Sequence, residues 1–230
     1  MDQNLHPSYG TSANALVVRN RILRNTYWLL AISMIPTILG AWLGVRLKFS
    51  FFAGSPFVGF MLFLAIAFGF FYAIERTKNS GLGVAILLGF TFFMGLMLSR
   101  LIGQVLGLTN GASLIMTAFG GTAAIFAVMA SIATFSKRDF SGLGKWLFAG
   151  VLVLLIAAAL NIFLQIPALY LAVSALAIAI FSAYILFDVQ QIINGGETNY
   201  IAATLAIYLD LYNIFANLLA LLGIVGGERD

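Results

Sequence analysis

Seven long apolar stretches occupy most of this chain, and their lengths constrain its fold more than any other feature. They cover approximately residues 27–45, 57–74, 81–99, 112–135, 143–165, 168–189 and 201–225. A helix needs about 20 predominantly apolar residues to cross the hydrocarbon core of a bilayer, and every stretch is of this order. The sequence therefore predicts an all-α integral membrane protein with seven transmembrane helices.

The composition agrees with this class. The chain has 230 residues, of which 62% are hydrophobic and 9% are charged, and its mean hydropathy is +1.03. Soluble domains carry roughly 25% charged residues, so most of the surface of this chain must face lipid. The absence of cysteine excludes disulfides and thiol chemistry. The only histidine, His6, lies in the polar N-terminal segment, so a histidine-based metal site or catalytic triad is not expected. Basic residues are not interleaved with aromatic ones, so nucleic-acid binding is not expected either.

The sequence divides into a polar, basic N-terminal tail (1–26), a transmembrane domain (27–225) and a short C-terminal tail (226–230). If the N-terminus is cytoplasmic, the inside regions hold eight basic residues: Arg19, Arg21, Arg24, Arg76, Lys78, Lys137, Arg138 and Lys145. The outside regions then hold four: Arg46, Lys48, Arg100 and Arg229. Because cytoplasmic loops carry an excess of lysine and arginine, the bias predicts an inner-membrane protein with a cytoplasmic N-terminus and a periplasmic C-terminus.

Two aspartates lie inside stretches that are otherwise apolar. Asp188 ends the sixth stretch, and Asp210 lies about nine residues into the seventh. A carboxylate at membrane depth costs about 2.5–3.5 kcal/mol on insertion scales, so such residues are rare and usually face a cavity or a partner. Both aspartates map to the cytoplasmic side of consecutive helices. We therefore expect them to approach each other.

Three further residues are candidates for the same site. Asn213 and Asn217 follow Asp210 at i+3 and i+7, so the three residues share one face of the predicted helix. This polar stripe indicates a helix that is surrounded by protein or borders a wet cavity. Arg76, at the cytoplasmic end of the second stretch, either snorkels to the membrane interface or reaches the two aspartates.

Two carboxylates within hydrogen-bonding distance titrate as a coupled unit. With one shared proton, Asp188 and Asp210 bridge the sixth and seventh helices. When both are ionised, they repel each other and attract a cation. The pair is therefore a candidate pH switch and, because calcium prefers oxygen ligands, a candidate weak calcium site. We expect no resident cofactor other than weakly bound or transported calcium.

Several strings along the chain resemble one family. AFGGTAAIFA, SKRDFSGLG, NIFLQIPAL, YILFDVQQI and YLDLYNIFANLL occur in the order typical of the Bax inhibitor-1 family, the transmembrane Bax-inhibitor-motif proteins. LRNTYWLL and GGETNYIAATLAIYLDLYNIF are similar to its bacterial YccA branch. The resemblance extends from about Arg19 to Gly226, and the string in the seventh stretch is its most specific part.

This resemblance implies a seven-helix bundle in which the last helix is central and enclosed by the other six. It also implies that Asp188 and Asp210 match the aspartate pair that acts as a proton-sensitive latch in calcium-leak members. For the YccA branch, the implied partner is the membrane protease FtsH, which engages the N-terminal cytoplasmic tail. The chain departs from leak-type members at Glu75, which stands beside Arg76, and around Ala220, where only apolar residues occur.

Three functions therefore compete. The first is a non-enzymatic modulator of FtsH-dependent quality control that contains an aspartate switch, and it is favoured by the branch resemblance and by the tail. The second is a pH-gated calcium or proton leak. The third is an intramembrane aspartyl protease, which is disfavoured because Asp210 follows Ile-Tyr-Leu rather than Gly-x-Gly. The apolar stretches predict contact with the lipid bilayer, the resemblance implies FtsH as a partner, and the oligomeric state is left open.

Overall fold

The computed structural model describes residues 9–49 and 54–227, and these residues form seven α-helices and no strand. The helices are α1 (Tyr9–Arg46), α2 (Pro56–Thr77), α3 (Gly81–Leu106), α4 (Gly111–Phe135), α5 (Leu143–Leu164), α6 (Pro167–Asn194) and α7 (Tyr200–Val225). All seven are long and apolar enough to cross a membrane. The predicted fold class is thereby confirmed. α3 is longer than its apolar stretch and ends at Leu106, just before Gly107.

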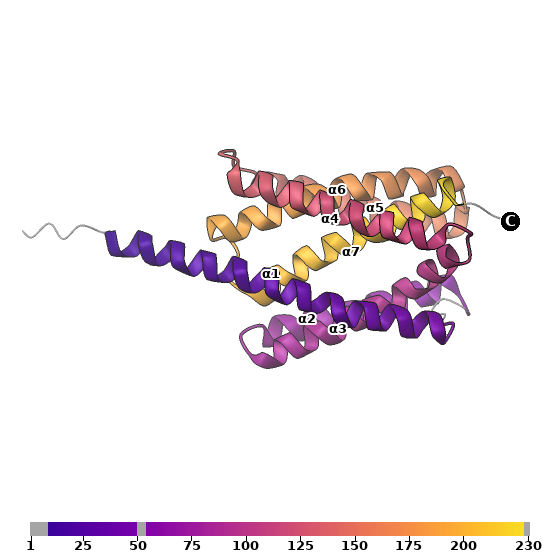
Figure 1. Ribbon diagram of the computed structural model, residues 1–230, viewed down its shortest axis with the longest axis horizontal. Coiled ribbons are helices and arrows are strands. Elements are labelled where there is room, and N and C mark those ends of the chain that lie inside the picture. Colours follow the sequence, from indigo (N-terminus) through magenta and orange to yellow (C-terminus); the bar gives the residue numbers. More distant parts are fainter. Residues whose placement is uncertain (1–8, 50–53, 228–230) are drawn as a thin grey trace, which may run out of the picture.

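The main difference from the sequence prediction lies at the start of α1. This helix has 38 residues and is therefore about 57 Å long at 1.5 Å per residue, nearly twice the roughly 30 Å hydrocarbon core. Its apolar span is Val17–Arg46. Residues 9–26, assigned from the sequence to a polar, basic tail, are helical, and the first part of α1 projects beyond the bundle (Figure 1). This part of the helix lacks the long apolar run by which the membrane-spanning helices are recognised in the sequence. Residues 1–8 and 228–230 of the two predicted tails lie outside the described residues.

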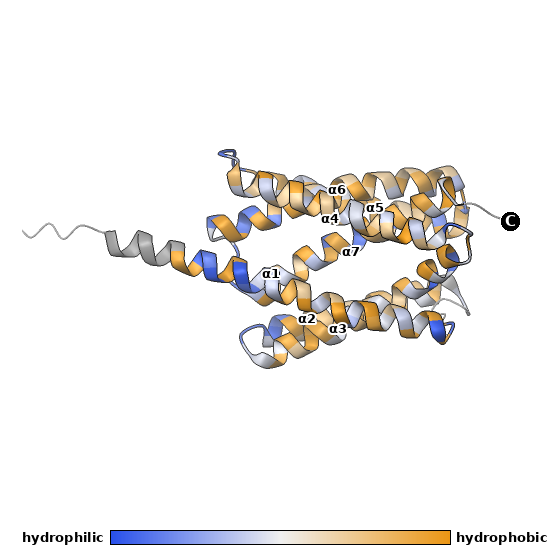
Figure 2. Cartoon of the chain, in the orientation of Figure 1, coloured by the Kyte–Doolittle hydropathy of each residue, from blue (hydrophilic) through white to orange (hydrophobic). Residues whose placement is uncertain are grey.

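The helices form two groups with α7 between them (Figure 1). α1 and α2 pack against α3, and α4 and α5 pack against α6. α7 contacts α1, α2, α3, α4 and α6. Its enclosure by all six other helices stays a prediction. Most of the ribbon within the bundle is coloured as hydrophobic, and hydrophilic residues gather in the loops and where α1 leaves the bundle (Figure 2).

The interface between α1 and α3 is a close contact of two backbones. A Cβ atom added at Gly40 would overlap the carbonyl oxygen of Phe92, and one added at Gly95 would overlap the carbonyl oxygen of Thr37. Small residues allow membrane helices to approach this closely, because their association depends on packing rather than on the hydrophobic effect. The lack of side chains at these two glycines therefore fixes α1 against α3.

Tyr208 attaches α7 to this pair of helices. Its side chain is 1% exposed, and its hydroxyl lies 2.9 Å from Oγ1 of Thr37 on α1. The same hydroxyl donates a long hydrogen bond of 3.4 Å to the carbonyl oxygen of Thr91 on α3. A buried tyrosine hydroxyl needs such partners, because an unpaired polar group is costly in an apolar interior. Tyr208 thus fixes the face of α7 that is turned toward α1 and α3.

Candidate functional site

The structure brings Asp188 and Asp210 together at the interface of α6 and α7. Asp188 lies six residues before the end of α6, and Asp210 lies ten residues after the start of α7. The two carboxyl groups lie close enough to interact directly. Because an ionised carboxylate only accepts hydrogen bonds, a direct hydrogen bond between the two groups requires a proton on one of them. A contact between α6 and α7 that depends on protonation stays a prediction.

The pair is placed where an unpaired charge is expensive. Asp210 is 4% exposed, and Asp188 is half-buried. Oδ2 of Asp210 is buried without a hydrogen-bond partner among the described residues. A buried carboxylate is stable only when it is paired, hydrogen-bonded or neutralised by a proton. An ionised, unpaired Asp210 would therefore be costly at this interface.

Two residues near the pair were not recognised from the sequence. Tyr184 interacts electrostatically with both aspartates, and Glu197, in the loop between α6 and α7, interacts with Asp188. Tyr184 precedes Asp188 by four residues, so helical spacing could have placed it on the same face. The position of Glu197 could not be inferred in this way, because it depends on how the loop folds back.

The turn between α6 and α7 is built by residues with specific backbone roles. Gly195 ends α6 with φ = 78°, a left-handed conformation that glycine adopts without strain. Oδ1 of Asn199 then accepts hydrogen bonds from the backbone amides of Ile201 and Ala202, which caps the start of α7. Nδ2 of Asn199 also donates to the carbonyl oxygen of Lys78 at 2.9 Å. The start of α7 is thereby fixed to the loop between α2 and α3.

Arg76 is not brought to the aspartates. Its Nε donates a 3.2 Å hydrogen bond to the hydroxyl of Tyr72, and its guanidinium lies 5.2 Å from the centroid of the Tyr72 ring. Both side chains are exposed at the end of α2. Of the two positions expected for Arg76, the structure therefore shows the one in which the side chain extends toward the membrane interface. Within the described part of the chain, the one ion pair joins Lys78 to Glu75 at 2.5 Å. Neither aspartate has a basic partner in that set.

Asn213 and Asn217 lie on α7 after Asp210, but their amides bond within their own helix. Nδ2 of Asn213 donates to the carbonyl oxygen of Leu209, and Nδ2 of Asn217 donates to that of Asn213, both at 2.8 Å. Such bonds satisfy an amide donor without a partner from another helix. No hydrogen bond from these amides to Asp210 occurs among the described residues, so their part in an ion path stays a prediction.

The arrangement offers a calcium ion few protein ligands. The described residues contain no group of three or more histidine, cysteine, aspartate or glutamate side chains that could hold a metal ion. Calcium takes six to eight oxygen ligands, so the two carboxylates would need carbonyl, amide or water oxygens in addition. A weak calcium site at Asp188 and Asp210 stays a prediction.

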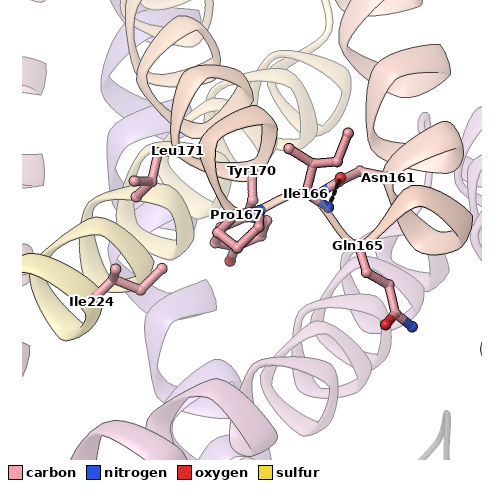
Figure 3. Close-up of a pocket in the computed structure, with 7 residues that line it drawn as sticks. All are labelled: Asn161, Gln165, Ile166, Pro167, Tyr170, Leu171 and Ile224. Atoms are coloured by element: carbon pink, nitrogen blue, oxygen red, sulfur yellow. Dashed lines mark hydrogen bonds between the residues drawn. The ribbon is translucent and has the colours of Figure 1, made fainter.

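Two adjoining cavities lie away from the pair, around the ends of α3 and α7 and the start of α6. The first, of about 240 Å³, is lined by Asn161, Gln165, Ile166, Pro167, Tyr170, Leu171 and Ile224 (Figure 3). The second, of about 530 Å³, shares Tyr170 and Ile224 with it. Oδ1 of Asn161 accepts a hydrogen bond from the amide of Ile166, whereas the Gln165 side chain points away from Asn161 (Figure 3). Neither aspartate lines these cavities, so the candidate site is the buried pair.

Comparison with known proteins gives a consistent result. Residues 19–227 match the family described as "Inhibitor of apoptosis-promoting Bax1". The "Modulator of FtsH protease YccA" of Escherichia coli is 38% identical over 97% of this chain and 98% of its own length. An uncharacterised protein of Neisseria meningitidis is 37% identical over 97% of this chain and 99% of its own length. An uncharacterised membrane protein of Vibrio cholerae is 34% identical over 91% and 92%, respectively.

Proposed function

Because the chain belongs to the family of inhibitors of apoptosis-promoting Bax1, we propose that it is a membrane-embedded modulator of an FtsH-type protease. The observation that carries this proposal is the 38% identity to the modulator from Escherichia coli, which spans 97% of this chain and 98% of that protein. An alignment of this extent includes every helix of the bundle. The proposed role is regulatory binding rather than catalysis.

The projecting part of α1 is the segment we propose for protease binding. The apolar stretch of α1 begins at about residue 27, whereas the helix itself begins at Tyr9, so its first part precedes the membrane-spanning part. Val17 and Val18 are 66% and 54% exposed, and Arg21 and Arg24 are exposed beside them. Ile22 and Leu23 pack against the core, so this part of α1 presents only its outer face, with both apolar and basic side chains, to a partner at the membrane surface.

We further propose that the N-terminus is cytoplasmic. The ends of α1 and α7 that bear the two termini lie at opposite ends of the bundle (Figure 1). The excess of basic residues on the side that bears the N-terminus, eight against four, favours this orientation. Fusions at the C-terminus test it: periplasmic phosphatase activity is expected, and cytoplasmic fluorescence would contradict it.

Within this framework, the pair of Asp188 and Asp210 acts as the pH-sensitive switch. One shared proton joins α6 to α7, and loss of that proton leaves two buried like charges next to each other. Since Tyr208 holds another face of α7 against α1 and α3, repulsion at the pair acts between α6 and α7. The switch would thus change the relative position of the two helix groups.

The modulator proposal is tested by producing the protein in bacteria and following the half-life of a membrane substrate of FtsH. We expect the substrate to be degraded more slowly and the protein to co-purify with the protease. A variant that lacks residues 2–23 loses Val17, Val18 and Arg21 but keeps Arg24 and the whole apolar stretch 27–45. It should be degraded more slowly itself, because the protease has lost its point of attachment. Unchanged substrate half-lives upon overproduction of the full chain would contradict the proposal.

A pH-gated leak of calcium or protons is the second candidate, and one observation favours it. The unpartnered Oδ2 of Asp210 leaves an acceptor at the buried pair that a proton, water or cation could satisfy. Calcium flux into proteoliposomes across a pH series tests this function directly. A leak should depend on pH in the wild type and lose that dependence in Asp210→Asn. Proteoliposomes without flux at any pH would rule out the leak and leave the modulator proposal intact.

A further inference from the structure

The loop between α4 and α5, residues 136–142, is attached to α6 by a single buried side chain. Nε2 of Gln190 donates a 2.7 Å hydrogen bond to the carbonyl oxygen of Arg138, and Oε1 of Gln190 accepts a 2.5 Å hydrogen bond from the amide of Phe140. Gln190 is 5% exposed. Both ends of its amide are therefore used to hold the backbone of this loop.

A second contact reinforces this attachment. Gly144, in the first turn of α5, lies so close to the ring of Phe187 that an added Cβ atom would be 2.8 Å from Cζ. Gln190 follows Phe187 at i+3, so the two side chains lie on the same side of α6. Asp188 stands between them in the sequence. The segment of α6 that carries Asp188 is thus the segment on which the α4–α5 loop rests.

The loop between α2 and α3 is attached to the other helix of the pair. Asn199, which caps α7, donates from Nδ2 to the carbonyl oxygen of Lys78 and to Oδ1 of Asn79, both at 2.9 Å. One loop is therefore bonded to α6 and the other to the start of α7. A relative movement of α6 and α7 would change the distance between the two loops.

The charged and titratable surroundings of the pair come from several elements. Tyr184 on α6 and Glu197 in the following loop interact with it electrostatically. Of the other helices that pack on α6, α4 contains no charged residue, α5 contributes the exposed Lys145, and α1 contributes Arg19, Arg21 and Arg24 near its start. None of these basic residues forms an ion pair with either aspartate in the described structure. The repulsion within an ionised pair is therefore not offset by a direct salt bridge.

We propose that Gln190 is a positioning residue that transmits the protonation state of the Asp188–Asp210 pair to the α4–α5 loop. This inference rests on the proposed switch and deepens it. When the pair loses its shared proton, α6 moves relative to α7, and the loop follows because both hydrogen-bonding groups of the Gln190 side chain hold it. The loop carries Lys137, Arg138 and Asp139, all exposed, so its displacement presents a rearranged charged surface to the cytoplasmic side.

Spin labels at two exposed positions test this coupling in the full-length protein. The chain has no cysteine, so thiol-reactive labels attach only to cysteines that are introduced. We place them at two exposed positions, with Glu75→Cys at the end of α2 and Lys137→Cys in the α4–α5 loop. The distance between the labels is measured across a pH series. The infrared signal of protonated carboxyl groups is followed in the same samples. With Gln190 intact, we expect the distance to shift by roughly 2 Å or more as that signal is lost.

Gln190→Leu removes both hydrogen bonds and should abolish this shift while the carboxyl signal still titrates. Gln191→Leu, the matched control on the same helix, should retain it. If Gln190→Leu cannot be purified in folded form, Gln190→Glu removes the donor to Arg138 and should reduce the shift. A shift that persists in the Gln190 variants overturns the coupling. A label distance that stays constant in the parent protein while the carboxyl signal titrates would also overturn the coupling. If the carboxyl signal does not titrate at all, the proposed switch itself is overturned.

Discussion

The interface between α1 and α3 and the interface between α6 and α7 solve the problem of helix packing in a membrane in opposite ways. At Gly40 and Gly95 the first interface brings backbone against backbone and leaves no room for a side chain. The second contains two carboxyl groups, one of which has a buried oxygen without a partner. The contacts at the two glycines involve no titratable group, whereas in the proposed switch the fit of the second interface depends on a proton. On this proposal, the bundle combines a fixed half with a half that responds to pH.

The largest expected effect comes from breaking the fixed interface. Gly95→Leu would push a side chain into the carbonyl of Thr37 and should lower the free energy of unfolding by about 3 kcal/mol, the upper part of the usual range for overpacked cores. Gly120→Leu is the matched control, because Gly120 is exposed and has open space around its Cβ position. Unfolding in detergent measures both variants. Equal stability of the two variants would contradict the close contact.

The next effect should appear at the responsive interface. Asp188→Leu leaves the buried carboxyl group of Asp210 without its partner, and an unsatisfied buried group costs about 1–3 kcal/mol. Asp188→Asn retains a hydrogen-bonding group and should be clearly more stable than Asp188→Leu. Both variants should lose the pH dependence of conformation. An Asp188→Leu variant as stable as Asp188→Asn would show that the pair does not hold α6 and α7 together.

Two tyrosines sharpen the comparison with a smaller effect. Tyr208→Phe removes the hydrogen bond to Thr37 and should cost about 1 kcal/mol at every pH, because the bond joins neutral groups. Tyr184→Phe should have less effect on stability and should leave the titration of the aspartate pair unchanged, because a phenol is neutral where carboxyl groups titrate. Unfolding curves at several pH values separate the two outcomes. A titration shift in Tyr208→Phe would mean that the two interfaces are not independent.

The smallest effect is expected at the exposed ion pair. The hydrogen bond to Glu75 raises the pKa of Lys78 above its ordinary value of 10.5. The contribution of this pair to stability is therefore complete below that value and is lost as the pH rises through the raised pKa. Glu75→Gln should leave melting temperatures unchanged between about pH 5 and 9, because exposed pairs contribute little. If the melting temperature of Glu75→Gln differed from the wild type in a pH-dependent way within this range, Glu75 rather than the aspartate pair would be the pH-sensitive group.

The sequence predicted the helices because long apolar runs have few alternative structures, and all seven occur. It also predicted that Asp188 and Asp210 would be neighbours, since both lie on one side of consecutive antiparallel helices. It did not predict that Arg76 would stack on Tyr72, or that the amide of Asn213 would hydrogen-bond within α7. A helical pattern shows on which face of the helix a side chain lies, but it does not show which of several nearby groups the side chain will contact. The contacts between Gln190 and the α4–α5 loop could not be predicted either, because they join residues about 50 positions apart and no sequence pattern relates residues at that distance.

The central claim is that Asp188 and Asp210 share one proton, and infrared spectroscopy of the protein in lipid tests it most directly. The wild type should show the band of a protonated carboxyl group that disappears as the pH is raised. Asp188→Asn and Asp210→Asn should each change that titration, because each leaves a single carboxyl group without its coupled partner. A wild-type protein without a protonated aspartate, or single variants that titrate like the wild type, would contradict the account.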